Sequence, residues 1–256
     1  MPKSKIEWLR DTDGRPGYSV NPVKGMCPHA CVYCYARAMY KRFKWEPELK
    51  FDWSVAQGLP KMKPGSKVFW GSTMDLFGDW IKPEWSRLIF EAVKRHPELT
   101  HIFLTKQPQR LAEFSPFPKN AWVGVTATNT EMLMRACSEL EYPAVAAKIT
   151  YLSIEPLLAW SFNWNKSYLV NTFKRAKINL IIIGAQTKPT VLPKIAWVRE
   201  IVEAADQAGI PVFLKNNLLP LVSKIGNASI ELTAIRENSP GSHSVVLRQE
   251  MPGTKG

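Results

Sequence analysis

Short apolar segments alternate with amphipathic helical segments along most of this chain, and this alternation restricts its fold more than any other feature. Most of the apolar segments are rich in β-branched and aromatic residues and end at glycine, proline or polar residues. Strands are expected at residues 18–22, 67–72, 101–105, 122–126, 148–153, 179–184 and 210–214. Because near-continuous apolar strands are buried on both faces, they predict a parallel sheet built from βα units.

The segments between these strands favour helices on the faces of the sheet. The clearest is residues 83–95, where Pro83 occupies the first turn and the apolar side chains fall on one stripe. Helices are expected at residues 35–43, 83–95, 109–114, 130–140 and 194–208. Six or seven βα units are too few for a closed eight-stranded barrel. The expected fold class is therefore α/β, a partial (β/α)6-type barrel with parallel strands.

Three regions are expected within the 256 residues: an irregular N-terminal lead-in at 1–16, the partial barrel at 17–224 and a C-terminal extension at 225–256. The extension is polar but contains a strand-like Ser244-Val-Val-Leu247, which leaves an edge hairpin and a mobile tail open. The first residues lack an apolar core of signal-peptide length, and the longest apolar run, around residues 180–183, is far short of a membrane span. These features predict a cytoplasmic protein.

Chemistry is expected at Cys27, Cys31 and Cys34, which are spaced C-x3-C-x2-C within one short loop. Three thiolates around an iron–sulfur cube bind three of its four irons, because each iron takes one protein ligand. The fourth iron then stays open to a small chelating molecule. The alternative is structural zinc, with His29 or Cys137 as the fourth ligand. No second C-x2-C knuckle accompanies the loop, and His29 would have to fold back between its own neighbours, so the iron–sulfur interpretation is favoured.

The cysteine loop resembles the signature of radical S-adenosylmethionine enzymes, in which an aromatic residue, here Tyr33, precedes the last cysteine. The flanking Asn21-Pro22, Gly25, Cys27-Pro-His29 and Tyr33-Cys34-Tyr35-Ala36-Arg37 are similar to the spore-photoproduct-lyase-like branch. Ile6-Glu7-Trp8 resembles a phage- and prophage-encoded relative of that branch whose substrate is not established. The resemblance extends from Ile6 to about Lys215, is most specific in the cysteine loop, and implies the same partial barrel.

The resemblance implies a cofactor pair and a reaction. Cys27, Cys31 and Cys34 would bind a 4Fe-4S cluster that chelates S-adenosylmethionine through its amino and carboxylate groups. Reduction by a flavodoxin- or ferredoxin-type electron donor would release methionine and a 5′-deoxyadenosyl radical, which abstracts a hydrogen atom from the substrate. Tyr33 would lie near the adenine. Met74 stands near the position where the lyase has a cysteine, so a modification reaction is favoured at least as much as lyase-type repair, and no catalytic residue is assigned.

Polar residues follow six of the expected strands, at the edge of the sheet where parallel βα folds bind ligands. They lie at residues 72–75, 105–107, 126–129, 153–156, 184–186 and 215–217. One such end can be a helix cap, whereas six alike indicate a ligand. In S-adenosylmethionine, the carboxylate suits Lys106 and the ribose hydroxyls suit Glu155 or Thr126. The lyase-like relatives contact the cofactor through a Thr-Lys and a Ser/Thr–Asp at two strand ends, which implies cofactor roles for Lys106 and for Ser72, Thr73 and Asp75.

The net charge of +12, from 34 basic and 22 acidic residues, is compatible with a nucleic-acid partner. Residues 40–45, Tyr-Lys-Arg-Phe-Lys-Trp, mix cations with aromatic side chains directly after the cysteine loop, which suits phosphate contacts and base stacking. The alternative for this cluster is a solvated helix face with its aromatic side chains turned inward. Two other functions stay open: a radical enzyme acting on a protein or small metabolite, and a non-enzymatic, zinc-stabilised nucleic-acid-binding module. A partner protein is compatible with the phage resemblance.

Overall fold

A computed structural model describes residues 3–141, 145–161, 165–223, 232–239 and 242–253. Seven strands form one sheet in the order β1 (Tyr18–Val20), β4 (Lys67–Trp70), β5 (Thr100–Thr105), β6 (Ala121–Thr126), β7 (Ile149–Ile154), β8 (Ile178–Ile183) and β11 (Val212–Leu214). The spatial order follows the chain order, and the strands run parallel, as successive βα units require. The seven expected strands are all present, which confirms an α/β partial barrel with parallel strands.

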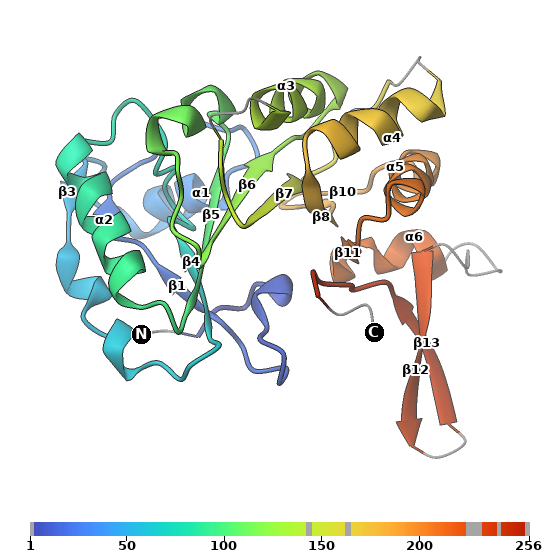
Figure 1. Ribbon diagram of the computed structural model, residues 1–256, viewed down its shortest axis with the longest axis horizontal. Helices are drawn as coiled ribbons and strands as arrows, with labels where there is room; N and C mark the ends of the chain where they lie inside the picture. The colour runs from blue at the N-terminus through green and yellow to red at the C-terminus, as the bar shows by residue number, and fades with distance from the viewer. Residues whose placement is uncertain (1–2, 142–144, 162–164, 224–231, 240–241, 254–256) are drawn as a thin grey trace. The chain divides into compact units, whose positions relative to one another are not determined.

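The strands are buried as a doubly covered parallel sheet demands. All four residues of β4 are buried, and Ile181, Ile182 and Ile183 of β8 are fully buried. Five longer helices accompany the strands (Figure 1): α1 (Tyr35–Phe43), α2 (Pro83–Arg95), α3 (Thr130–Glu141), α4 (Lys166–Arg175) and α5 (Ile195–Ala208). Each buries only part of its surface, which is the pattern expected of helices that cover a sheet.

The short helix expected at residues 109–114 is present as a 3-10 helix, η4 (Pro108–Phe114). One further helix was missed. The helix α4 was not expected at all, because its sequence contains Val170 and Thr172, whose β-branched side chains lower helix propensity. The helix begins after Asn165, whose side chain accepts a hydrogen bond from the Ser167 N–H at 3.1 Å. Burial of its apolar side chains, including the fully buried Phe173, outweighs the low propensity.

Shorter elements complete the chain. The 3-10 turns are η1 (Glu7–Leu9), η2 (Trp53–Ala56), η3 (Leu59–Lys61) and η5 (Asn216–Leu218), and a short helix, α6 (Leu219–Ser223), follows the last turn. Three antiparallel pairs join β2 (Val23–Lys24) to β3 (Lys50–Phe51), β9 (Gln186–Thr187) to β10 (Thr190–Val191), and β12 (Thr233–Ser239) to β13 (Ser242–Leu247). The last pair lies side by side as a hairpin in Figure 1, so of the two possibilities for the tail, the hairpin is the one present.

The chain divides into two compact units. The first contains residues 1–125 and 142–149, and the second contains residues 126–141 and 150–256. The cysteine loop, β1, β4 and β5 belong to the first unit; β7, β8, β11 and the C-terminal hairpin belong largely to the second. In the parts of the chain that the structure describes, no helix combines the length and apolar character needed to cross a membrane.

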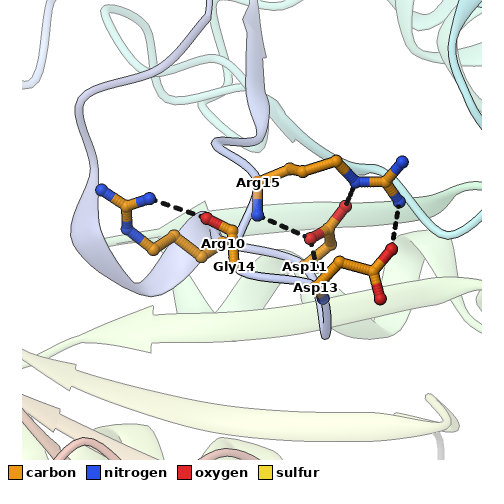
Figure 2. Close-up of polar contacts among 5 residues, drawn as sticks. All are labelled: Arg10, Asp11, Asp13, Gly14 and Arg15. Carbon is orange, nitrogen blue, oxygen red and sulfur yellow. Dashed lines mark hydrogen bonds and ion pairs between the residues drawn. The ribbon is translucent and has the colours of Figure 1, made fainter. Parts of the chain in front are cut away.

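A charged turn organises residues 10–15 of the N-terminal lead-in, which also contains the 3-10 turn η1 (Figure 2). The Asp11 carboxylate accepts hydrogen bonds from the Asp13 N–H at 3.0 Å, the Arg15 N–H at 2.8 Å and the Arg15 Nε at 2.6 Å. The Arg10 guanidinium donates to the Gly14 carbonyl at 2.7 Å. Just before the turn, Leu9 is fully buried. The lead-in is therefore packed onto the first unit.

Candidate cysteine-loop site

The three cysteines lie between β2 and α1 in two consecutive tight turns. The carbonyl of Cys27 accepts from the Ala30 N–H at 3.4 Å, and that of Cys31 accepts from the Cys34 N–H at 3.1 Å. Ala30 closes the first turn with a left-handed φ of 54°. Cys34 is the residue at which α1 begins. All three side chains are half-buried, so each thiol is partly accessible to a ligand.

The first helix and Gly25, the residue directly after β2, anchor this loop from both ends. Arg37 of α1 donates from its guanidinium to the Cys27 carbonyl at 2.9 Å. The buried Tyr40, one turn further along, accepts a hydrogen bond at its hydroxyl from the Gly25 N–H at 2.8 Å. Gly25 has a φ of 107°, and a side chain there would collide with the backbone of Glu48. The loop geometry therefore depends on a glycine that closely approaches the following segment.

The charge of each neighbouring thiolate affects the pKa of Cys27 and Cys31. A thiolate at Cys31 raises the pKa of Cys27, and a thiolate at Cys34 raises the pKa of Cys31, so neighbouring sulfurs in the loop lie within electrostatic reach. Burial is the largest cause that raises the pKa of both Cys27 and Cys31. A cation placed among the three sulfurs would remove this repulsion and favour the thiolates.

Two backbone N–H groups and one cation act on the loop thiols, whereas the charge of the Asp75 carboxylate raises the pKa of Cys27. Hydrogen bonds from the backbone N–H groups of Asp75 and His29 lower the pKa of Cys27, against the larger effect of burial. The charge of the Lys106 ammonium lowers the pKa of Cys31, against the larger effect of burial. Burial is the main cause that lowers the pKa of His29, and the Lys106 charge lowers it further. Lys106, expected at the end of β5, is therefore close enough to act on the cysteine loop.

Tyr33 turns its hydroxyl toward the cysteines. Burial is the main cause that raises the pKa of Tyr33, and a hydrogen bond to Cys31 adds to it. The expected place of this ring beside an adenine stays a prediction. What the structure gives Tyr33 is a contact with the middle thiol.

Asp75, predicted as a cofactor contact at the end of β4, ties that strand end to β5. Its carboxylate accepts from the Thr105 hydroxyl at 2.8 and 3.0 Å, from the Lys106 N–H at 2.8 Å and from the Phe77 N–H at 3.1 Å. The Thr105 hydroxyl is also the acceptor for the Gln107 N–H at 2.8 Å. Both carboxylate oxygens therefore have protein partners, and Asp75 fixes the backbone that carries Lys106.

Ser72 and Thr73 are held by Asn21, the residue that directly follows β1. The Asn21 side chain exchanges hydrogen bonds with the Ser72 hydroxyl at 3.0 and 3.1 Å and accepts from the Thr73 N–H at 3.1 Å. The Tyr35 hydroxyl donates to the Ser72 carbonyl at 2.7 Å. Sequence reasoning assigned no role to Asn21 or Tyr35 here. The rule that strand ends carry the site would have selected Asn21, because it follows β1 as Ser72 follows β4.

The two remaining predicted residues belong to the second unit. Thr126, the last residue of β6, is buried, and its hydroxyl has no hydrogen-bond partner within the described residues. Glu155, just after β7, forms an ion pair with Lys215, just after β11. Gly184 lies against this pair: a Cβ on it would stand 3.0 Å from the Lys215 Cδ and 3.1 Å from the Glu155 Cγ. The structure therefore gives Glu155 a protein partner, whereas none of the described residues bonds to the Thr126 hydroxyl.

The zinc alternative can be compared with the geometry. Among the residues that the structure describes, no three His, Cys, Asp or Glu side chains converge as ligands of a single metal ion. Cys137, the other sulfur considered as a zinc ligand, is buried in α3, and burial raises its pKa to about 12.

Comparison with known proteins identifies a family. The profile of a family described as "Protein of unknown function (DUF5131)" matches residues 3–218 of the 256. The chain belongs to the DUF5131 family. The match includes the cysteine loop and every predicted site residue, and it ends before the C-terminal hairpin. A search of curated proteins finds no relative of this DUF5131 member.

Proposed function

We propose that this protein is a radical S-adenosylmethionine enzyme that binds a 4Fe-4S cluster through Cys27, Cys31 and Cys34. The observation that carries the proposal is the cysteine loop itself, in which three half-buried thiols lie between β2 and α1, within reach of Asp75 after β4 and Lys106 after β5. When bound and reduced, the cluster would supply the electron that splits S-adenosylmethionine into methionine and a 5′-deoxyadenosyl radical.

The residues around the thiols suit a cluster that carries negative charge. Soft thiolate ligands favour iron–sulfur clusters over hard cations. The backbone N–H groups of Asp75 and His29 point at Cys27, and the Lys106 ammonium acts on Cys31. Such donors and cations stabilise thiolates and raise the potential at which a cluster is reduced. In the structure these contacts offset only part of the burial that raises the pKa of Cys27 and Cys31.

The second ligand, S-adenosylmethionine, finds fewer free groups. The buried Thr126 hydroxyl lacks a partner within the described parts of the chain, which costs roughly 1–3 kcal/mol unless a ligand supplies a hydrogen bond. Lys106 remains the proposed partner of the ligand carboxylate. Ser72, Thr73, Asp75 and Glu155 already hold protein groups, so the proposal assigns them chiefly to positioning; Tyr33 is proposed beside the adenine.

The proposal also includes a substrate class, an electron donor and a cellular compartment. The net charge of +12 favours a nucleic-acid substrate, modified or repaired after hydrogen abstraction. A flavodoxin- or ferredoxin-type protein would deliver the electron, and the phage resemblance leaves room for a further partner protein. Because the thiols must stay reduced, we place the enzyme in the cytoplasm.

Anaerobic purification tests the proposal directly. We expect a brown protein with about four irons per chain and formation of 5′-deoxyadenosine from S-adenosylmethionine and dithionite. Cys31→Ala should lose the iron and the product while its circular dichroism spectrum is unchanged. Cys137→Ala, a matched loss of a thiol elsewhere, should keep both. Colourless protein with one zinc per chain, or iron retained equally by Cys31→Ala, would contradict the assignment.

A further inference from the structure

The C-terminal end of α1 presents aromatic rings and cations to solvent. Phe43 is 51% exposed and Trp45 is 46% exposed, and Lys41, Arg42 and Lys44 between and beside them are exposed as well. These five residues, 41–45, are called the α1 platform below. Large exposed aromatic side chains are uncommon on protein surfaces that have no partner.

The α1 platform is built by the way the helix ends. Lys44 adopts a left-handed conformation (φ 51°), and the N–H groups of Lys44 and Trp45 both donate to the Tyr40 carbonyl. This reversal returns Trp45 onto Phe43, with ring centroids 5.3 Å apart and planes 24° from parallel. Tyr40 packs edge-on against Trp45 at 5.3 Å and is itself buried. The two exposed rings are therefore held in a fixed stack on a buried third ring.

The platform also carries three cations, Lys41, Arg42 and Lys44. The Arg42 guanidinium lies 5.3 Å from the centre of the Phe43 ring. Within the described parts of the chain, no ion pair joins Lys41, Arg42 or Lys44 to a carboxylate. The nearby Glu48 is 3.3 Å from Lys50 and is thereby compensated. The inward-turned arrangement considered for residues 40–45 thus applies to Tyr40 and not to Phe43 or Trp45.

From this geometry we propose that the α1 platform binds single-stranded nucleic acid, with a base stacked on the Phe43–Trp45 pair and phosphates on Lys41, Arg42 and Lys44. Proteins that bind single strands combine these two elements, flat aromatic surfaces and a cationic track. A protein partner fits less well, because one helix end offers far less area than the roughly 800 Å² per side of a stable protein interface.

The position of the platform connects it with the cysteine loop. Cys34 stands at the beginning of α1 and Phe43 is its last residue, so about 14 Å of helix separates them at 1.5 Å per residue. A strand held on the platform would therefore pass the loop within a few nucleotides. The role of the platform in selecting a nucleic-acid substrate rests on the proposed function. Binding of a single strand to the platform requires neither the cluster nor S-adenosylmethionine.

Fluorescence anisotropy with a labelled twelve-nucleotide oligothymidine, added to the anaerobically purified full chain, tests the inference. Loss of one stacking ring by alanine substitution weakens single-strand binding by about 5- to 150-fold, and we expect this of Phe43→Ala and of Trp45→Ala. Tyr168→Ala, which removes an exposed aromatic side chain of α4, is the matched control and should bind as the unmodified chain does. Circular dichroism should be the same for all three variants.

Salt dependence separates stacking from charge. Each lost phosphate contact lowers the slope of log affinity against log salt by about 0.7 for single strands. Lys41→Ala and Arg42→Ala should each show that change, whereas Lys174→Ala, an exposed cation of α4, should not. The aromatic variants should weaken binding without changing the slope.

Three results would overturn the inference. The first is unchanged oligothymidine affinity in both aromatic variants. The second is equal binding of heparin, with losses only in the cation variants. The third is equal binding of polyglutamate that is lost in the aromatic variants, since this points to an acidic protein. Cys31→Ala separates the two proposals: iron-free chain that still binds oligothymidine through the platform keeps this inference, even where the proposed activity fails.

Discussion

At the scale of single residues, Asp75 carries more of the site than its position at a strand end suggests. We expect Asp75→Ala to lower the free energy of unfolding by about 3 kcal/mol, because the Lys106 N–H and the fully buried Thr105 hydroxyl lose a charged acceptor. Asp75→Asn keeps one acceptor oxygen and should lose about 1 kcal/mol. Urea unfolding followed by circular dichroism measures both. Asp13→Ala, at an exposed carboxylate, serves as the control, and equal stability of the Asp75→Ala and control variants would refute the argument.

His101 on β5 makes stability depend on pH. The Trp70 indole N–H donates to His101 Nδ1 at 2.9 Å, so this nitrogen is the acceptor and the ring is neutral. Burial lowers the pKa of His101 to about 4. Below pH 6.5, the ordinary pKa of histidine, His101 is protonated in the unfolded chain but stays neutral in the folded chain. The stability present above pH 6.5 is therefore lost as the pH falls toward 4. The whole loss is about 3 kcal/mol.

Comparison with His101→Gln isolates this contribution. Glutamine keeps an acceptor for Trp70 but cannot titrate, so its unfolding free energy should fall less steeply between pH 6.5 and 4 than that of the unmodified chain. Urea midpoints at several pH values supply the two slopes. Carboxylates titrate in both proteins and cancel in the difference. Parallel slopes would show that His101 is not the responsible group.

Individual site residues were only partly predictable from the sequence. The spacing of the three cysteines and the strand-end position of Lys106 identified residues that the fold brings within electrostatic reach. The partner of each polar side chain was not predictable, because Asp75 with Thr105 and Glu155 with Lys215 are pairs from different strands, up to 60 residues apart. These pairings decide which carboxylate oxygens remain available to a ligand.

At the scale of elements, two glycines in left-handed conformations separate backbone strain from lack of space. Gly25→Ala puts a Cβ 2.5 Å from the Glu48 carbonyl oxygen at a φ of +107°, whereas Gly14→Ala, at +75°, meets nothing within 4 Å. We expect Gly14→Ala to cost about 1 kcal/mol and Gly25→Ala at least about 2 kcal/mol more. Thermal or urea unfolding measures both. Equal costs would mean that the segment around Glu48 moves away freely.

The elements themselves were largely predictable where local sequence and burial agree. Strands such as β8, with its run of isoleucines, are apolar because both faces are covered, so their sequence reports their position. The helix α4 was not predicted from the sequence, because tertiary burial of Phe173 and its neighbours, and not helix propensity, stabilises it. The sequence near Pro108 predicted a short helix but did not show that η4 is a 3-10 helix and not an α-helix.

At the scale of the whole chain, the family match and the fold end at different places. The match stops at residue 218, yet residues 248–250 run antiparallel beside β11. The Leu214 N–H donates to the Arg248 carbonyl at 2.8 Å, and the Glu250 N–H donates to the Val212 carbonyl at 3.0 Å. Arg248 also pairs with Asp206 of α5 at 2.8 Å. The C-terminal segment therefore covers a sheet edge of the second unit that would otherwise expose unpaired backbone groups.

Removal of this cover should have a visible cost. A chain truncated after residue 231 leaves the Leu214 N–H and Val212 carbonyl without partners and uncovers an apolar edge strand, so we expect a lower urea midpoint and concentration-dependent association by light scattering. Arg248→Ala should lose about 1–2 kcal/mol, because its side chain is only 12% exposed. Arg95→Ala should lose less than about 0.5 kcal/mol, because the Arg95 side chain is 75% exposed beside Glu91. A truncated chain that stays monomeric with an unchanged midpoint would show that β11 needs no such cover.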